Sequence, residues 1–218
     1  MKRAKRFSSV RPAYVAEDFS GKCRVFPAPR PDGREPMLIA YQADWFEDRS
    51  RLIIGEKSRQ IGWSWSEACK IVDEVSRDTA RLDHWVSSRD EIQARLFLDD
   101  CKGFAEIYQL AAKDLGEQVI DDKGGSALVL EFANGKRAHS MSSNPDAQAG
   151  KRGGRTLDEF ALHKDPRRLY SIAYPGITWG GALSIFSTHR GTGNYFNTLI
   201  NEIKHEGNPS ALSRARPR

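Results

Sequence analysis

The stretch LIIGEKSRQIGWSW, residues 52–65, decides the fold that this sequence predicts. Its apolar run from Leu52 to Ile54 is typical of a buried strand and leads into a short polar loop that contains Gly62. From Ser64 onward, apolar residues recur at the spacing of a helix. A strand, a glycine-containing loop and a helix in this order are the context of a phosphate-binding loop, where backbone N–H groups and the helix N-terminus face an anion.

The loop departs from the Walker A pattern G-x-x-x-x-G-K-[ST] at two positions. Ser58 stands where the first glycine is expected and Trp63 where the lysine is expected, whereas Ser64 matches the hydroxyl residue that contacts Mg²⁺. Two cations can replace the missing lysine, because Lys57 lies just before the loop and Arg59 lies within it. A front lysine can fold back over a phosphate on its long stem. An ordinary strand-to-helix turn with exposed charges is the alternative.

Length and composition indicate one globular domain. The chain has 218 residues, which is enough for a sizeable core. Cys23, Cys69 and Cys101 are isolated from one another, which argues against a disulfide framework and a zinc site and fits a reducing cytoplasm. We find no run apolar enough to span a membrane and no secretory signal. We therefore expect a cytoplasmic protein.

Basic residues are concentrated at the two ends of the chain. The formal net charge is +5, and the cations at the ends exceed this total, so the rest of the chain is slightly acidic. A basic arm can hold nucleic-acid phosphates, whereas a solvated end that aids solubility is the alternative. The cations are Lys2, Arg3, Lys5, Arg6 and Arg11 at one end and Arg214, Arg216 and Arg218 at the other.

Residues 1–36 are rich in proline, arginine and glycine, and they predict a basic arm with an extended lead-in. Residues 37–205 predict the folded domain, and residues 206–218 a flexible basic tail. Within the domain we expect helices over 37–48, 64–75, 89–112 and 195–203, strands over 52–54, 84–88 and 182–187, and a hairpin over 127–142 that turns at Asn134-Gly135. This alternation predicts a three-layer α/β fold with a mainly parallel central sheet flanked by helices.

The helical segment 89–112 carries apolar residues that predict its buried face. Helical spacing places them on one side, where they are more typical of a core than of a binding surface. They are Ile92, Leu96, Phe97, Phe104, Ile107 and Leu110.

The second decisive stretch is TLDEF, residues 156–160. In ATP hydrolysis, the first of two adjacent acids can hold Mg²⁺ and the second can orient or deprotonate the attacking water. Asp158 and Glu159 follow the phosphate-loop candidate at a distance suited to an α/β core. Only Leu157 is apolar directly before Asp158, so either the strand is very short or the two acids are an ordinary surface pair.

Three polar residues elsewhere lie at positions that suit a ligand site. The side-chain amide of Gln42 can read adenine, whose edge offers a donor and an acceptor, and a polar position on an exposed helix face is the alternative. Ser187 and Thr188 end the apolar run 182–187. Small hydroxyl residues at the carboxyl end of a strand lie at the ligand edge of an open parallel sheet.

The turn-rich stretch 144–155 is also basic. Lys151, Arg152 and Arg155 lie among glycines, where they can follow a phosphate backbone or sense a nucleotide. A mobile surface loop is the alternative.

Three stretches together resemble the large terminase subunit of tailed bacteriophages, in its Mu-like branch. They are EKSRQIGWSW (56–65), LDEFALHKDP (157–166) and STHRGTGNYF (187–196), and the resemblance covers roughly residues 37–200. It implies a P-loop NTPase domain that hydrolyses ATP with Mg²⁺ and moves double-stranded DNA into a procapsid.

The resemblance also implies a role for each matching residue. Lys57 and Arg59 would hold the β- and γ-phosphates, and Arg59 would also stabilise charge in the transition state. Ser64 and Asp158 would position Mg²⁺, and Glu159 would activate water. Ser187 and Thr188 would couple hydrolysis to DNA movement. The implied nucleotide-binding set is Gln42, Lys57, Ser58, Arg59, Gln60, Ile61, Gly62, Trp63, Ser64 and Trp65.

Members of this family work with a portal protein and a small terminase subunit, as an oligomeric ring in the host cytoplasm. They also carry a nuclease domain after the ATPase, and we expect this chain to be too short to hold it, so we expect no nuclease activity. A helicase-like DNA translocase is one alternative. A module that binds nucleotide or a partner without hydrolysis is the other.

Overall fold

The computed structural model describes residues 37–120, 125–205 and 212–213. The predicted basic arm, residues 1–36, lies outside this range, and so does the predicted tail apart from residues 212–213, which pair with a strand of the sheet. Among the described residues, no helix has the length and apolar character needed to cross a lipid bilayer.

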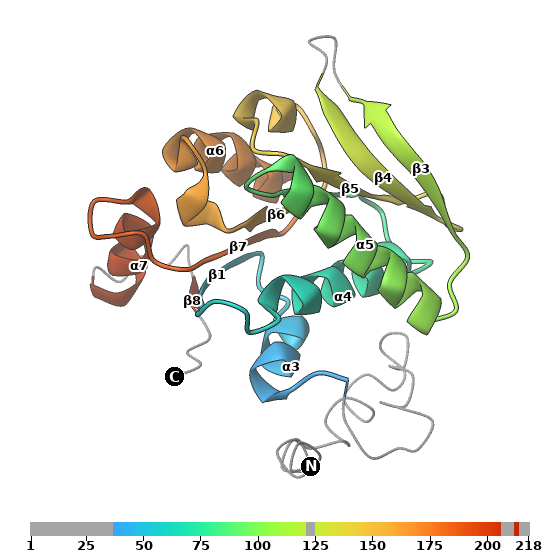
Figure 1. The fold of residues 1–218 in the computed structure, drawn as a ribbon, viewed down its shortest axis with the longest axis horizontal. Coiled ribbons are helices and arrows are strands. Elements are labelled where there is room, and N and C mark those ends of the chain that lie inside the picture. Colours follow the sequence, from blue (N-terminus) through green and yellow to red (C-terminus); the bar gives the residue numbers. More distant parts are fainter. Residues whose placement is uncertain (1–36, 121–124, 206–211, 214–218) are drawn as a thin grey trace.

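In the described residues a mixed sheet of eight strands forms the middle layer, in the order β3-β4-β5-β2-β6-β7-β1-β8 (Figure 1). From β5 to β8 neighbouring strands run parallel, whereas β3 and β4 add an antiparallel extension at one edge. The strands are β1 (Leu52–Glu56), β2 (His84–Ser87), β3 (Ala112–Val119), β4 (Ser126–Phe132), β5 (Arg137–Met141), β6 (Gly154–Asp158), β7 (Leu183–Ser187) and β8 (Leu212–Ser213).

Helices cover both faces of this sheet, which confirms the predicted three-layer α/β architecture (Figure 1). One buried cluster joins α3, α4 and α5 to β2, β4 and β5, and a second joins α6 and α7 to β1, β6 and β7. The helices are α3 (Ala40–Glu47), α4 (Trp63–Val75), α5 (Glu91–Ile107), α6 (Pro166–Ala173) and α7 (Tyr195–His205), with 3₁₀ turns η1 (Pro145–Gln148), η2 (Phe160–Leu162) and η3 (Tyr174–Trp179).

Strand β1 shows why the apolar run at its start forms a central strand. Leu52 and Ile54 pack in the cluster with α6 and α7, whereas Ile53 packs with Trp45 and Trp63 on the opposite face. Alternate side chains of a strand point to opposite faces, so a strand between two helical layers must be apolar on both. The run therefore sets β1 in the middle of the molecule.

The predicted hairpin is confirmed, and the predicted helix over 89–112 is partly wrong. Strands β4 and β5 pair antiparallel around a turn in which Gly135 has φ +76°. Helix α5 ends at Ile107, and Ala112 already begins β3. Phe97 and Phe104 are buried as predicted, whereas Ile92, Leu96 and Ile107 are exposed by 71%, 54% and 44%. The face of α5 that packs on α4 and the sheet is formed by Ala94, Phe97, Leu98, Cys101, Phe104 and Ala105.

Candidate functional site

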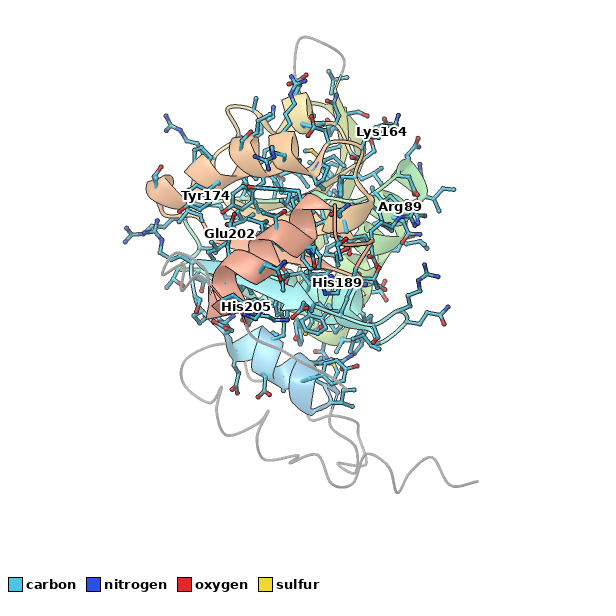
Figure 2. The ribbon with its side chains drawn as sticks, turned by 90° about the vertical axis from the view of Figure 1, so that its left-hand side faces the viewer. Arg89, Lys164, Tyr174, His189, Glu202 and His205 are labelled. Carbon is cyan, nitrogen blue, oxygen red and sulfur yellow. The ribbon has the colours of Figure 1, made fainter. Side chains whose placement is uncertain are left out.

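The carboxyl ends of β1, β6 and β7 meet at one edge of the sheet. Register pairs Glu56 of β1 with Ser187 of β7, and Asp158 of β6 with Phe186 of β7. The loops that follow these strands and β2 therefore gather on one side of the molecule. In Figure 2, Arg89, Lys164 and His189, which lie in three of these loops, occupy the same side. This edge is where open parallel sheets bind ligands.

The loop 57–62 turns sharply before α4. Gln60 and Gly62 have φ angles of +55° and +73°, in the left-handed region that glycine adopts at least cost. A Cβ atom at Gly62 would also lie 2.7 Å from Gln42 Nε2. Gly62 is the N-cap of α4, so the helix N-terminus with its unpaired N–H groups opens onto the loop.

Trp63 fills the position of the usual loop lysine, and its side chain points into the core. The residue is 2% exposed, and its ring meets those of Trp45 at 4.9 Å and Phe186 at 6.4 Å between centroids. A Cβ atom at residue 55 would lie 2.7 Å from Trp63 Cζ2, so Gly55 in β1 makes room for the indole. The cation that a phosphate loop needs must therefore come from another position.

Lys57 is placed to supply that cation. Its side chain is 5% exposed and its ammonium forms an ion pair with Glu159. The backbone N–H of Lys57 donates to Ser187 O at 3.1 Å, which ties the start of the loop to the end of β7. Arg59, the second predicted cation, is exposed on the loop. The structure thus brings Lys57 to the acids and leaves Arg59 facing solvent.

Ser64, in the first turn of α4, contacts Asp158 at the end of β6. Ser64 Oγ donates to Asp158 Oδ1 at 3.0 Å. Burial, and then the charge of Glu159, raises the pKa of Asp158 to about 7. A divalent cation would relieve this cost, and Mg²⁺ binds proteins through one or two carboxylates while it keeps several waters. The hydroxyl and the carboxylate therefore fit a Mg²⁺ site.

Glu159 takes an unusual backbone conformation directly after β6. Its φ is +50°, which a non-glycine residue adopts only where the surrounding structure holds it. Ser187 Oγ lies 3.5 Å from Glu159 Oε2 and accepts a hydrogen bond from Ala161 N at 3.0 Å. Ser187 therefore contacts both the acid and the turn that follows it. Thr188 contacts this cluster through its backbone O, which accepts a hydrogen bond from Ser187 Oγ at 3.0 Å.

Two neighbours of this cluster were not predicted as site residues. His163 Nε2 donates to Asp158 O at 2.9 Å, while its Nδ1 faces Ser143 Oγ at 2.6 Å. Glu56 forms an ion pair with Lys204 of α7, and its Oε1 lies 2.6 Å from His189 Nε2. His163 could have been proposed from the sequence, because it follows Asp158 by only five residues. The partners of Glu56 lie far away in the sequence and could not be read from it.

Gln42 lies against the phosphate-loop candidate, with its side-chain amide fully engaged. Its Nε2 donates to Ile61 O at 3.2 Å and to Gly62 O at 3.1 Å, and its Oε1 accepts from Ile39 N at 3.2 Å. The residue is 7% exposed. The structure therefore brings Gln42 to the loop, where it binds backbone groups.

The basic stretch 151–155 divides into buried and exposed residues. Arg155 is 2% exposed, and its guanidinium donates to Gln148 O at 3.0 Å, to Gln148 Oε1 and to Lys151 O. Burial lowers the pKa of Arg155 to about 10. Lys151 is partly buried with its ammonium over the Trp85 ring, whereas Arg152 is exposed. Arg155 cannot follow a phosphate backbone from this position, so we leave it out of any nucleic-acid contact.

Two curated proteins are similar to this chain in sequence. The Mu-like prophage FluMu protein gp28 of Haemophilus influenzae is 32% identical over 172 residues, which are 77% of this chain and 34% of that protein. The probable terminase, large subunit gp28, of Escherichia phage Mu is 33% identical over 179 residues, 78% of this chain and 32% of that protein. The chain thus spans about a third of the length of these relatives. No protein-family model matches it.

Solved structures of large terminases share the fold. The large terminase ATPase domain of Thermus phage P74-26 has a TM-score of 0.54 at 18% identity, covering 86% of this chain and 85% of that one. The HK97 bacteriophage large terminase has a TM-score of 0.58 at 14% identity, covering 94% of this chain and 44% of that one. A large terminase from a thermophilic bacteriophage, solved in complex with ADP, has a TM-score of 0.56 at 17% identity, covering 78% and 42%.

Proposed function

The chain is a relative of the large terminase subunits of Mu-like phages, and from this premise we propose that residues 37–205 form an ATPase domain of a DNA-packaging motor. The observation that carries the proposal is the convergence of Lys57, Ser64, Asp158 and Glu159 at the carboxyl ends of β1 and β6. Phosphoryl transfer needs positioning and charge neutralisation more than covalent chemistry, and these side chains supply both.

Lys57 would bind the β- and γ-phosphates from the front of the loop. In the structure its ammonium already lies over the acids, held by Glu159 and largely shielded from water. A triphosphate carries more negative charge than one carboxylate, so it can draw the ammonium away from Glu159. The N–H groups at the start of α4 would add a second positive contact. Arg59, on the exposed loop, would reach the same phosphates from solvent and stabilise the charge of the transition state.

Ser64 and Asp158 would hold Mg²⁺, which when bound neutralises phosphate charge. Their oxygens are 3.0 Å apart, and Asp158 is fixed by its place at the end of a buried strand. His163, which donates to the backbone oxygen of Asp158, would keep the turn after β6 in place. The chain's contribution here is a preformed pair of oxygen ligands.

Glu159 would act as the base that orients and deprotonates the attacking water. While paired with Lys57 it is masked, and the departure of Lys57 to a phosphate would leave its carboxylate able to accept a proton. Ser187 contacts Glu159 and the turn after it, so it would transmit a change at the acid to β7 and the following loop. Thr188 would act in the same coupling segment.

The remaining family functions are extended to this chain as part of the same proposal. Gln42 would read adenine after giving up its contacts with the loop carbonyls. Lys151 and Arg152 would contact the backbone of double-stranded DNA. The working assembly would be an oligomeric ring in the host cytoplasm, with a portal protein and a small terminase subunit as partners.

Phosphate release from ATP with Mg²⁺, measured with and without double-stranded DNA, tests the site. Lys57→Ala and Glu159→Gln should each lower turnover by about 100-fold or more, because each removes a charge aimed at the reacting groups. Trp63→Phe is the matched control, since it keeps an aromatic ring in the core and should leave turnover within about three-fold. Adding Trp63→Lys to Lys57→Ala should not restore activity, because residue 63 points away from the loop.

Two results would count against the proposal. Full turnover in both Lys57→Ala and Glu159→Gln would remove the site assignment. Binding of ATP by the unaltered chain without phosphate release, even with DNA present, would instead favour a nucleotide-binding module that does not hydrolyse.

A further inference from the structure

Glu67 is a buried acid that the proposed reaction does not use. It lies in α4, three residues after Ser64, and is 1% exposed. Its two carboxylate oxygens each receive one hydrogen bond, Oε2 from Trp45 Nε1 and Oε1 from Thr156 Oγ1, both at 2.6 Å. In the described part of the chain no salt bridge reaches Glu67. Burying a carboxylate without a cation is costly, so both hydrogen bonds must be kept.

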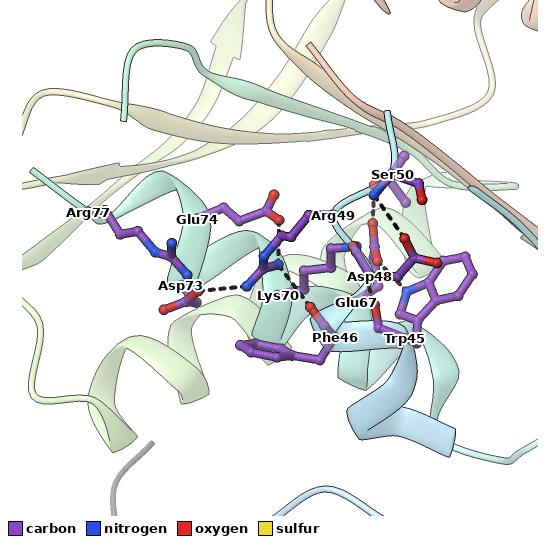
Figure 3. A network of polar contacts seen from close by, with 11 residues as sticks. Trp45, Phe46, Asp48, Arg49, Ser50, Glu67, Lys70, Asp73, Glu74 and Arg77 are labelled. Atoms are coloured by element: carbon purple, nitrogen blue, oxygen red, sulfur yellow. Dashed lines mark hydrogen bonds and ion pairs between the residues drawn. The ribbon is translucent and has the colours of Figure 1, made fainter. Parts of the chain in front are cut away.

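The first of these bonds fixes the orientation of α3. Trp45 lies one turn after Gln42, so the rotation of the helix that suits the Trp45–Glu67 bond also sets the direction of Gln42. Figure 3 shows Trp45 and Glu67 side by side, with Lys70 reaching the same end of the helix. Lys70 Nζ donates to Asp48 O at 2.6 Å, and Arg49 Nη1 bonds Glu74 at 2.8 Å. Helix α3 is therefore held to α4 at its C-terminal end and oriented by Glu67.

The second bond reaches the strand that carries the proposed catalytic acids. Thr156 lies in β6, two residues before Asp158. Thr156 Oγ1 donates its one proton to Glu67 Oε1, so it accepts the hydrogen bond from His84 Nε2, 2.8 Å away. Burial lowers the pKa of His84 to about 4, which keeps the ring neutral near pH 7. One polar chain thus runs from α3 through α4 and β6 to β2.

We propose that Glu67 is a positioning residue that couples the loop-contacting helix α3 to strand β6. Because one rigid carboxylate holds both partners, a shift of α3 turns the carboxylate and pulls on Thr156, and a shift of β6 acts back on Trp45. A displacement of Gln42 therefore shifts Asp158, and a displacement of Asp158 shifts Gln42. The kinetic consequence of this coupling rests on the proposed ATPase function, whereas the mechanical coupling does not.

Amide hydrogen exchange of α3 tests the coupling without any nucleotide. Thr156→Val removes the hydroxyl at nearly constant shape, and Thr156→Ser is the matched control that retains it. The valine variant should raise exchange of residues 40–47 by about ten-fold, the effect of losing one hydrogen bond to a charged group, although the side-chain hydrogen bonds of Thr156 in the described residues go to Glu67 and His84 and not to α3. The serine variant should stay within about two-fold of the unaltered chain. Helix α6, on the other face of the sheet, is the internal reference.

Steady-state kinetics with ATP and GTP give a second measurement. If Gln42 reads adenine, Thr156→Val should lower the preference for ATP as well as kcat, whereas Thr156→Ser should restore both. A purely structural residue would instead raise exchange equally in α3 and α6, or raise it only in β6 and β2, and either pattern would overturn the proposal. If the unaltered chain hydrolyses neither nucleotide, the proposed function fails, and hydrogen exchange still decides the coupling.

Discussion

Lys57 and Arg155 are two buried cations that the sequence presents in similar surroundings, yet the structure gives them different partners. Both lie in glycine-containing, basic stretches that predict phosphate contacts. Lys57 pairs with one carboxylate, that of Glu159, at the edge of the sheet. Arg155 instead binds the backbone oxygens of Gln148 and Lys151 and the side-chain oxygen of Gln148.

The difference teaches how to separate a functional cation from a structural one. An ammonium held by a single acid can exchange that acid for a phosphate, because the ligand replaces one negative group with another. A guanidinium that satisfies several backbone carbonyls cannot leave without exposing buried acceptors. Burial alone does not distinguish the two cations, whereas the nature of their partners does.

The largest expected effect on stability belongs to Arg155. Arg155→Met should lower the free energy of unfolding by about 3 kcal/mol, because it leaves several buried acceptors unpaired. Arg155→Lys, which keeps a charge but fewer donors, should lose less. Lys57→Met should cost about 1 kcal/mol, since Glu159 is partly open to water and can be solvated. Urea denaturation measures all three, and equal losses for Arg155→Met and Lys57→Met would erase the comparison.

The next effect comes from His84, whose Nε2 lies 2.8 Å from Thr156 Oγ1 of β6. In the folded chain its pKa is about 4, against about 6.5 in the unfolded chain. As pH falls below about 6.5, His84 becomes protonated in the unfolded chain but stays neutral in the folded chain, so the free energy of unfolding decreases. Between pH 7 and pH 5 this should remove about 2 kcal/mol. An NMR titration in which the folded His84 ring becomes protonated near pH 6.5 would contradict the assignment.

Much of the fold follows from local pattern, and part of the site does too. The strand, loop and helix over residues 52–75 can be predicted because apolar spacing and a glycine are local signals. Lys57 can be predicted as a phosphate-binding residue because it lies at the start of this loop. Strand β6 is harder, because Arg155 and Thr156 look like loop residues. Arg155 is satisfied by Gln148 and Lys151, which lie in the turn-rich stretch just before it. Thr156 is satisfied by Glu67 and His84, which come from distant parts of the chain and could not be paired with it from the sequence.

The exposed apolar residues of α5 show the same limit from the other side. Helical spacing predicted Ile92 and Leu96 as buried, but these two side chains lie outside the face of α5 that packs on α4. Which face of a helix is covered depends on the placement of its neighbours, and periodicity alone does not provide it. The Glu67 network was missed for a related reason, because an acid within a helix is normally a solvated residue.

The smallest expected effect concerns Arg152, the exposed residue of the basic stretch. Arg152→Ala should reduce the slope of log affinity for double-stranded DNA against log salt by about 1, and weaken binding equally across sequences. Arg152→Lys should preserve the slope. An unchanged slope in the alanine variant would remove Arg152 from the proposed DNA surface. Arg152 and Arg155 would then differ only in their burial.

The most direct test of the central claim is a structure with a non-hydrolysable ATP analogue and Mg²⁺ bound. The account predicts Lys57 Nζ within about 3 Å of a β- or γ-phosphate oxygen and no longer paired with Glu159, while the Trp63 indole stays in the core. A structure in which the analogue is bound elsewhere, or in which Lys57 remains on Glu159 beside a phosphate held by other cations, would contradict it.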